Sequence, residues 1–196
     1  MSTNIPHRPM PSSTNRLSRA TLFWECFATP EFPDLGSGPR CGVLPEVTLE
    51  IRLLELTREY NLSIPAAELL TATALLYHDN HDPAHNLVQD RGDRDACLIH
   101  ALLHRREPDY WNAAYWFRRV SGHPIYATAT PAVIQAAQTP EARSVLERLT
   151  LSGNLDPLAL VQECERMAKR PDAQAIAYLR QVQHLEFAAL VEHLLA

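Results

Sequence analysis

Apolar residues recur at helical spacing along most of the chain beyond residue 44. The first stripe, with spacings of four, three and four, consists of Leu49, Leu53, Leu56 and Tyr60. Alternate residues from 47 to 53 are also apolar, which would suit a strand, but Glu, Leu and Arg dominate this window and favour a helix. We therefore expect a helix from Pro45 to about Tyr60, with the proline in its first turn.

Prolines and small polar residues indicate where the later helices begin, because proline suits the first turn of a helix and Asp or Ser can cap it. Together with the apolar periodicity, they predict helices that begin near residues 65, 83, 93, 109, 131, 140, 157 and 172. The last of these is the longest and runs to the C-terminus. The pattern predicts an all-α fold, a single-domain multi-helix bundle over residues 44–196.

Residues 1–43 differ from the rest of the chain in composition. They hold six prolines and many small polar residues, which bury too little apolar surface to offset the loss of chain entropy on folding. We expect a proline-rich N-terminal tail that is partly disordered and mobile to about residue 20. An apolar cluster interrupts it and is expected to dock on the helical domain or, alternatively, to bind a partner: Leu22, Phe23, Trp24 and Phe27.

Charge and hydropathy argue against two broad classes of partner. The formal net charge of −5 argues against nucleic acid, because affinity for phosphates requires an excess of Lys and Arg. The longest apolar runs are far shorter than the roughly 18 residues that cross a bilayer, so we expect a soluble protein with no membrane partner. The oligomeric state is left open.

Cysteine usage bears on the cellular compartment. The four cysteines form no CxxC pair, and Cys97 and Cys164 lie in helical stripes as small hydrophobic residues. With no secretory apolar region near the N-terminus, a cytoplasmic location is favoured. The first 24 residues lack Asp and Glu and carry three arginines, so a mitochondrial transit peptide is the alternative.

The segment from His100 to Pro124 concentrates the candidate chemistry. It holds three histidines, four arginines, two acids, an asparagine and five aromatic residues. Aromatic residues suit a packed helix, but a core does not need so many titratable groups beside them. We expect a polar pocket between the helices around residues 83–90, 94–106 and 109–120.

Two histidines in this segment have the spacing of metal ligands. His100 and His104 are one helical turn apart, so both imidazoles can face one ion. A third ligand could come from His85, His81, His78 or Glu107. The Glu of an HExxH motif is missing, so the favoured expectation is no cofactor, with both rings hydrogen-bonded at the edge of the core. A divalent metal held by His85, His100 and His104 is the alternative.

Arginines around the bend predicted at Pro108 suggest an anion site. Arg105, Arg106, Arg118 and Arg119 carry forked donors that suit a carboxylate or phosphate. Tyr115 and Trp116 could stack on a planar ligand. The alternative is that carboxylates neutralise these arginines in ion pairs, with Glu107, Asp109 or Glu186 as the partner.

Other polar residues are expected to complete the pocket. Asn112 is unusual inside a helix, because a short amide competes with the helical backbone. It is expected either to face water or to bridge to a partner such as His123 or Gln89. Gln183, Glu186 and His193 on the last helix would face either the same pocket or solvent.

The segment HALLHRREPDYWNAAYWFRRVSGHP, with HNLVQ upstream and QVQHLEF downstream, resembles a family of uncharacterised all-helical proteins of fungi and bacteria. The shared signature is HxxxQ followed by an HRREPDYxNAxYWxRRxGxHP-type stretch, and it is most specific between His104 and Pro124. The residues that fall on it are His85, Gln89, His100, His104, Arg105, Arg106, Glu107, Asp109, Asn112, Tyr115, Trp116, Arg118, Arg119, Gly122, His123 and Pro124. The resemblance implies an all-helical domain and a shared site, and it names no reaction.

These patterns lead to two hypotheses of different classes. The first is a helical protein that binds a small anionic or polar molecule, with His100, His104 and Glu107 as candidate catalytic residues for acid–base chemistry. The candidate ligand-binding residues are His85, Gln89, Arg105, Asp109, Asn112, Tyr115, Trp116, Arg118, Arg119 and His123. The second is a non-enzymatic binding or interaction module, in which the same residues form a rigid hydrogen-bond network.

Overall fold

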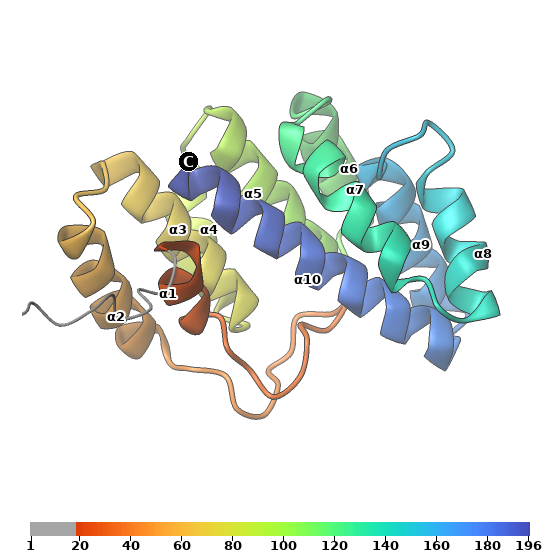
Figure 1. The fold of residues 1–196 in the computed structure, drawn as a ribbon, viewed down its shortest axis with the longest axis horizontal. Coiled ribbons are helices and arrows are strands. Elements are labelled where there is room, and N and C mark those ends of the chain that lie inside the picture. Colours follow the sequence, from red (N-terminus) through yellow and green to blue (C-terminus); the bar gives the residue numbers. More distant parts are fainter. Residues whose placement is uncertain (1–18) are drawn as a thin grey trace, which may run out of the picture.

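The computed structural model describes residues 19–196, which form ten helices and no strand (Figure 1). The helices are α1 (Arg19–Glu25), α2 (Glu46–Glu59), α3 (Ile64–Tyr77), α4 (His81–Val88), α5 (Arg94–Arg106), α6 (Tyr110–Arg119), α7 (Pro124–Ala136), α8 (Pro140–Leu149), α9 (Pro157–Lys169) and α10 (Ala173–Leu195). The prediction of an all-α fold is confirmed. Across the described range, each helix is too short or too polar to cross a bilayer.

Helix α10 runs through the middle of the molecule (Figure 1). Its N-terminal part lies near α8 and α9, α7 packs along it, and its C-terminal part lies near α1 and α3. Leu179, Val182, Phe187 and Leu190 of this helix are buried. The apolar period that the sequence shows in the last helix therefore faces neighbours on several sides, as expected for a central helix.

Capping residues begin several helices where the sequence predicted them. The Asp93 carboxylate accepts a hydrogen bond from the Ala96 amide at 3.0 Å at the start of α5. Asp156 does the same for the Leu158 amide at 2.8 Å, directly before Pro157. These side chains satisfy amides that have no partner inside the helix, which fixes where each helix starts.

Two helix starts were predicted wrongly. Helix α7 begins at Pro124, with His123 as its N-cap, and Pro131 lies inside it. A proline in a helix removes the bond to the carbonyl four residues earlier, but Pro131 and Ala127 are both exposed, so water can reach that carbonyl. Helix α4 begins at His81, two residues before Pro83, because the turn at Asp79, with φ of 63°, already reverses the chain after α3.

A smaller correction concerns α6. Pro108 lies before the helix, and Asp109 is the N-cap, whose carboxylate accepts a hydrogen bond from the Asn112 amide at 3.3 Å. The helix therefore starts at Tyr110. This cap places Asn112 in the first turn, facing α5.

The described part of the predicted tail is packed on the helical domain. Phe23 and Phe27 are buried, and the Trp24 ring stacks on Phe27 with centroids 5.0 Å apart. Arg40 binds the Asp79 carboxylate through both its amide and its side chain. The docking expected for the aromatic cluster is confirmed, whereas the mobility expected up to about residue 20 falls almost wholly on residues 1–18, which lie outside the described range.

Consecutive arginines at the end of α5 hold three parts of the fold together. Arg105 is fully buried and donates to Glu186 of α10 at 2.5 Å, while Arg106 is fully buried and donates to Asp79 at 2.6 Å. Arg106 also donates to backbone carbonyls of Asp34 and Leu76.

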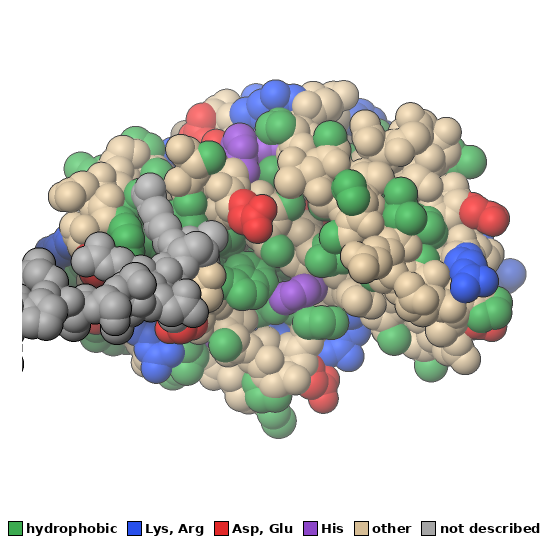
Figure 2. Space-filling model, viewed as in Figure 1, with side chains coloured by type: hydrophobic (Ala, Val, Ile, Leu, Met, Phe, Trp, Pro, Cys, Tyr) green, Lys and Arg blue, Asp and Glu red, His purple; other side chains and the backbone are tan. Residues whose placement is uncertain are grey.

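On the face drawn in Figure 2, the charged side chains are scattered rather than gathered into one large patch.

Candidate functional site

Helices α4 and α5 bring three histidines together, which we call the histidine cluster: His85, His100 and His104. The Nε2 atoms of His85 and His100 lie 3.0 Å apart, and one ring nitrogen from each of the three residues lies within 4.8 Å of the others. His100 and His104 are buried and stack face to face, with ring centroids 4.7 Å apart. The one-turn spacing in the sequence thus produces a compact group of imidazoles, with the third ring supplied by α4.

Two polar neighbours fix the orientation of His104. Its Nδ1 lies 3.1 Å from Glu107 Oε2, and its Nε2 lies 3.1 Å from the Asn112 side-chain amide. A carboxylate can only accept a hydrogen bond, so Nδ1 carries the proton and Nε2 keeps its lone pair. Asn112 therefore bridges to a partner, which is one of the two outcomes that the sequence suggested, but the partner is His104 rather than His123 or Gln89.

Helix α6 covers the other side of the cluster. Trp116 stacks on the His100 ring with centroids 4.1 Å apart and an interplanar angle of 23°. Asn112 and Trp116 are one turn apart on α6, and they meet His104 and His100, which are one turn apart on α5. The two helices are antiparallel, so each of two successive turns of α6 contacts one histidine of α5. These two contacts hold the imidazoles in fixed positions.

The electrostatic environment keeps the imidazoles of His100 and His104 neutral. Burial, together with the nearby His104 and His85 rings, lowers the pKa of His100 to about 4. Burial also lowers the pKa of His104, although the carboxylates of Glu107 and Asp109 act in the opposite direction. His100 Nδ1 is shielded from solvent and has no hydrogen-bond partner in residues 21–196. A neutral imidazole is the form that ligates a metal ion.

A second group joins Asp95, His123 and His193. The Nε2 atoms of both histidines lie 2.9 Å from the same oxygen, Asp95 Oδ1. His123 also accepts a hydrogen bond from the Ile125 amide through Nδ1, so its proton is on Nε2 and points at the carboxylate. That tautomer suits a hydrogen-bonded link between α5, the start of α7 and α10, which we call the clasp, better than it suits a metal site.

The predicted anion site is not assembled from the four arginines. Arg105 and Arg106 are neutralised by Glu186 and Asp79 rather than by Glu107 and Asp109. Arg118 and Arg119 are exposed on α6, and Arg119 lies over the Trp116 ring at 5.3 Å. Glu186, 81 residues away from Arg105, was one of the three acids that the sequence suggested as partners, whereas Asp79 was not.

Several other predicted residues also lie apart from the histidine cluster. Gln89 is exposed and its amide is 3.5 Å from Asn86. Asp109 caps α6 and acts on His104 only through its charge, and His123 belongs to the Asp95 group. Tyr115 is exposed on α6, where its ring meets the edge of Trp116. The structure therefore brings together His85, His100, His104, Glu107, Asn112 and Trp116.

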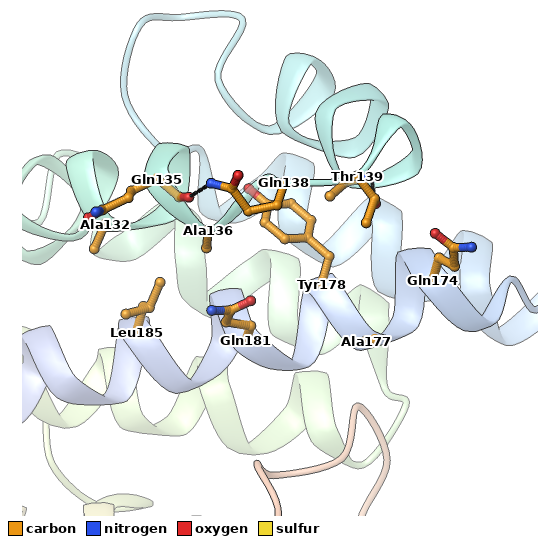
Figure 3. Close-up of a pocket in the computed structure, with 11 residues that line it drawn as sticks. Ala132, Gln135, Ala136, Gln138, Thr139, Gln174, Ala177, Tyr178, Gln181 and Leu185 are labelled. Carbon is orange, nitrogen blue, oxygen red and sulfur yellow. Dashed lines mark hydrogen bonds between the residues drawn. The ribbon is translucent and has the colours of Figure 1, made fainter.

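A cavity of about 600 Å³ lies elsewhere, between α10 and the region where α7 leads into α8 (Figure 3). Its walls are mainly glutamine and alanine side chains, and Gln138 donates to the Gln135 carbonyl across its upper side. Tyr178 is the one lining residue that titrates, and burial raises its pKa to about 12 while its hydroxyl donates to the Val133 carbonyl. This cavity offers amide groups but no acid or base for catalysis.

No protein-family model, no curated protein and no solved structure matches this chain. The resemblance suggested by the HRREPDY signature therefore stays a prediction.

Proposed function

We propose that the histidine cluster binds one divalent transition-metal ion and presents it to a small anionic or polar molecule. The observation that carries this proposal is the convergence of His85, His100 and His104 with a carboxylate behind one of them. A tetrahedral zinc ion with bonds of about 2.0–2.1 Å holds its nitrogen ligands roughly 3.3 Å apart. The 3.0 Å between His85 and His100 is close to that value, so only a small ring adjustment is needed for that pair.

Protonation supports the same function. Since the pKa of His100 is about 4 and that of His104 is also lowered, both rings are neutral at pH 7. One Nε2 of the His85–His100 pair carries the proton of their hydrogen bond, and this proton has only to move to the other nitrogen of its ring when a metal ion binds. Glu107 accepts a hydrogen bond from the Nδ1–H group of His104, which leaves Nε2 as the ligand atom. A carboxylate behind a metal-binding histidine is the usual arrangement that sets its tautomer and orientation.

Three protein ligands leave a coordination position for water or for a substrate atom, which is the pattern of catalytic rather than structural zinc sites. A metal ion at His104 Nε2 would require the Asn112 amide, which lies 3.1 Å from that atom and donates to its lone pair, to turn away. A metal ion bound there would polarise an oxygen of the ligand or activate a water molecule. We therefore favour metal-dependent chemistry over direct histidine acid–base catalysis, for which a pKa of about 4 is poorly matched to neutral pH.

The test is a metal titration of the full chain, purified without a histidine tag and stripped with a chelator. Cobalt(II) or zinc(II) should bind with one ion per chain, as measured by elemental analysis and by the visible absorption of the cobalt form. His104→Ala should abolish tight binding, and Glu107→Gln should weaken it roughly 10–100-fold. His193→Ala is the matched control, because it removes a histidine of the Asp95 group.

The outcomes separate this function from its rivals. Metal loss in His193→Ala but not in His104→Ala would move the site to the Asp95 group. A chain that binds no metal, and that loses stability in His104→Ala, would instead support the interaction module with a structural hydrogen-bond network.

We also propose a reducing compartment, cytoplasmic or mitochondrial, which is supported by four free cysteines and can be checked with a fluorescent fusion.

A further inference from the structure

Helix α6 carries an exposed aromatic pair, which we call the aromatic slot: Trp111 and Tyr115. Trp111 is 79% exposed and Tyr115 is 44% exposed. The two side chains leave the same face of α6 one turn apart, and their rings are almost parallel, with an interplanar angle of 13°. Large aromatic groups exposed together are characteristic of binding surfaces rather than of an ordinary solvated helix face.

The spacing of the pair suits a third ring. The centroids of Trp111 and Tyr115 are 6.5 Å apart, at the upper end of the range in which two rings attract each other directly. Van der Waals contact between carbon atoms requires about 3.5 Å, so a planar ring in contact with both faces needs roughly 7 Å between them. A small outward rotation of the exposed Trp111 side chain provides the remaining distance.

The charge beside the slot is positive. The Arg119 guanidinium lies 5.9 Å from the Tyr115 centroid and donates to the Tyr115 hydroxyl at 3.4 Å. Within residues 21–196 it makes no ion pair with an acid, whereas Arg105 and Arg106 each bind a buried carboxylate. A ligand that brings an anionic group to Arg119 would supply an acidic partner beside the Tyr115 hydroxyl and the Cys97 thiol that this guanidinium already contacts.

The slot is continuous with the histidine cluster along α6. Asn112 follows Trp111 and binds His104, and Trp116 follows Tyr115 and stacks on His100. Successive residues of a helix point about 100° apart, so the slot occupies the face of α6 next to the one that contacts the histidines.

We propose that the aromatic slot is the substrate-binding part of the metal site and that it takes a planar aromatic molecule with a carboxylate or similar anionic group. The ring lies between Trp111 and Tyr115, and the anionic group lies against Arg119. This inference rests on the proposed function in treating the bound molecule as a substrate for the metal. Binding of the ring itself requires only the residues of α6.

The probe is 2-naphthoate, titrated into the full chain and followed by calorimetry and tryptophan fluorescence. Cyclohexanecarboxylate tests the need for a planar ring, and 2-naphthamide tests the need for charge. We expect saturable binding of 2-naphthoate, with at least tenfold weaker binding of both analogues. Trp111→Ala, Tyr115→Ala and Arg119→Gln should each weaken naphthoate binding at least fivefold, because stacking and charge pairing each contribute measurably. Leu151→Ala, at another exposed apolar residue, is the matched control.

The results distinguish this inference from the metal proposal. The His104→Ala variant should no longer bind metal, but naphthoate should still quench its tryptophan fluorescence. The Trp111→Ala variant should no longer bind naphthoate, but it should bind metal as the wild type does. Naphthoate that fails to saturate, or that binds equally well to Trp111→Ala, overturns the slot while leaving the metal site standing. Equal binding of cyclohexanecarboxylate also overturns it, because the surface would then be a general anion site.

Discussion

The buried pair of Arg105 and Glu186 allows a quantitative test of how the helices are held together. Both side chains are fully buried, and the guanidinium donates to both carboxylate oxygens, at 3.2 and 2.5 Å, and to Gln183 at 3.2 Å. Burial alone would lower the pKa of Arg105, but the Glu186 carboxylate raises it above its ordinary value. Removing one partner of such a pair leaves an uncompensated buried charge, which costs about 3–5 kcal/mol.

We therefore expect Arg105→Met to lower the free energy of unfolding by about 3–5 kcal/mol. In a chain of 196 residues, a loss of this size corresponds to roughly 6–20 °C in the melting temperature. Urea unfolding followed by circular dichroism measures the free energy directly. Arg118→Met is the matched control on an exposed arginine, and it should change stability by about 0.5 kcal/mol or less.

The double variant decides whether the effect comes from the orphaned charge. Arg105→Met combined with Glu186→Gln removes both charges and keeps an acceptor for the Tyr126 hydroxyl, which donates to Glu186 at 3.0 Å. Its destabilisation should be smaller than the sum of the two single effects by roughly 2 kcal/mol or more. Additive effects, or a cost of Arg105→Met below about 1 kcal/mol, would refute the reasoning, since neither is compatible with a buried charge left alone.

Three further predictions concern single residues. Burial would raise the pKa of Asp79, but hydrogen bonds from Arg40 and Arg106 lower it below 3.8, so its contribution to stability is present above about pH 4 and is lost as the pH falls through the lowered value. Urea unfolding should show this loss in the wild type and not in Asp79→Asn. Burial and the charge of Arg106 lower the pKa of His81 to about 4, whereas the unfolded chain takes up the proton near pH 6.5. The free energy of unfolding should therefore fall between about pH 6.5 and 4, and His81→Leu should reduce that slope. Asp95→Ala removes the shared acceptor of two histidines and should lower the free energy of unfolding by about 1–3 kcal/mol. It should also speed amide exchange at the C-terminal end of α10, and unchanged protection there would contradict the clasp.

The local part of the fold could be predicted from the sequence, because helix starts depend on residues that are adjacent in the chain. The cap at Asp156 before Pro157 is an example. Pro131 misled the prediction, because whether a helix tolerates an internal proline depends on the exposure of the freed carbonyl, which is a tertiary property. Similarly, α4 starts early because Asp79 is held in a left-handed turn by distant arginines.

Of the candidate site, only the part formed by residues close together in the chain could be predicted. The spacing of His100 and His104 places their rings on one face of a helix, and the sequence shows that directly. The approach of His85 depends on how α4 packs on α5, so the sequence could offer it only as one of several third ligands. The pairing of Asn112 with His104 depends on the antiparallel arrangement of α5 and α6, which the sequence does not encode at any single position.

The turn at the end of α5, from His104 to Glu107, contains two residues of the candidate site and two arginines that hold the fold together. Variants at neighbouring positions of this turn therefore have different effects. Successive side chains point about 100° apart around α5, so His104 faces α4 and α6 while Arg105 faces α10 and Arg106 faces Asp79. Loss of function in a variant of Arg105 or Arg106 would therefore come from loss of folded protein. Asn112 and Glu107 instead contact His104 at a partly exposed edge, so their variants report on the site itself. A measurement of metal binding has to be normalised to folded protein, because only then does a residue that orients a ligand differ from one that holds the helices together.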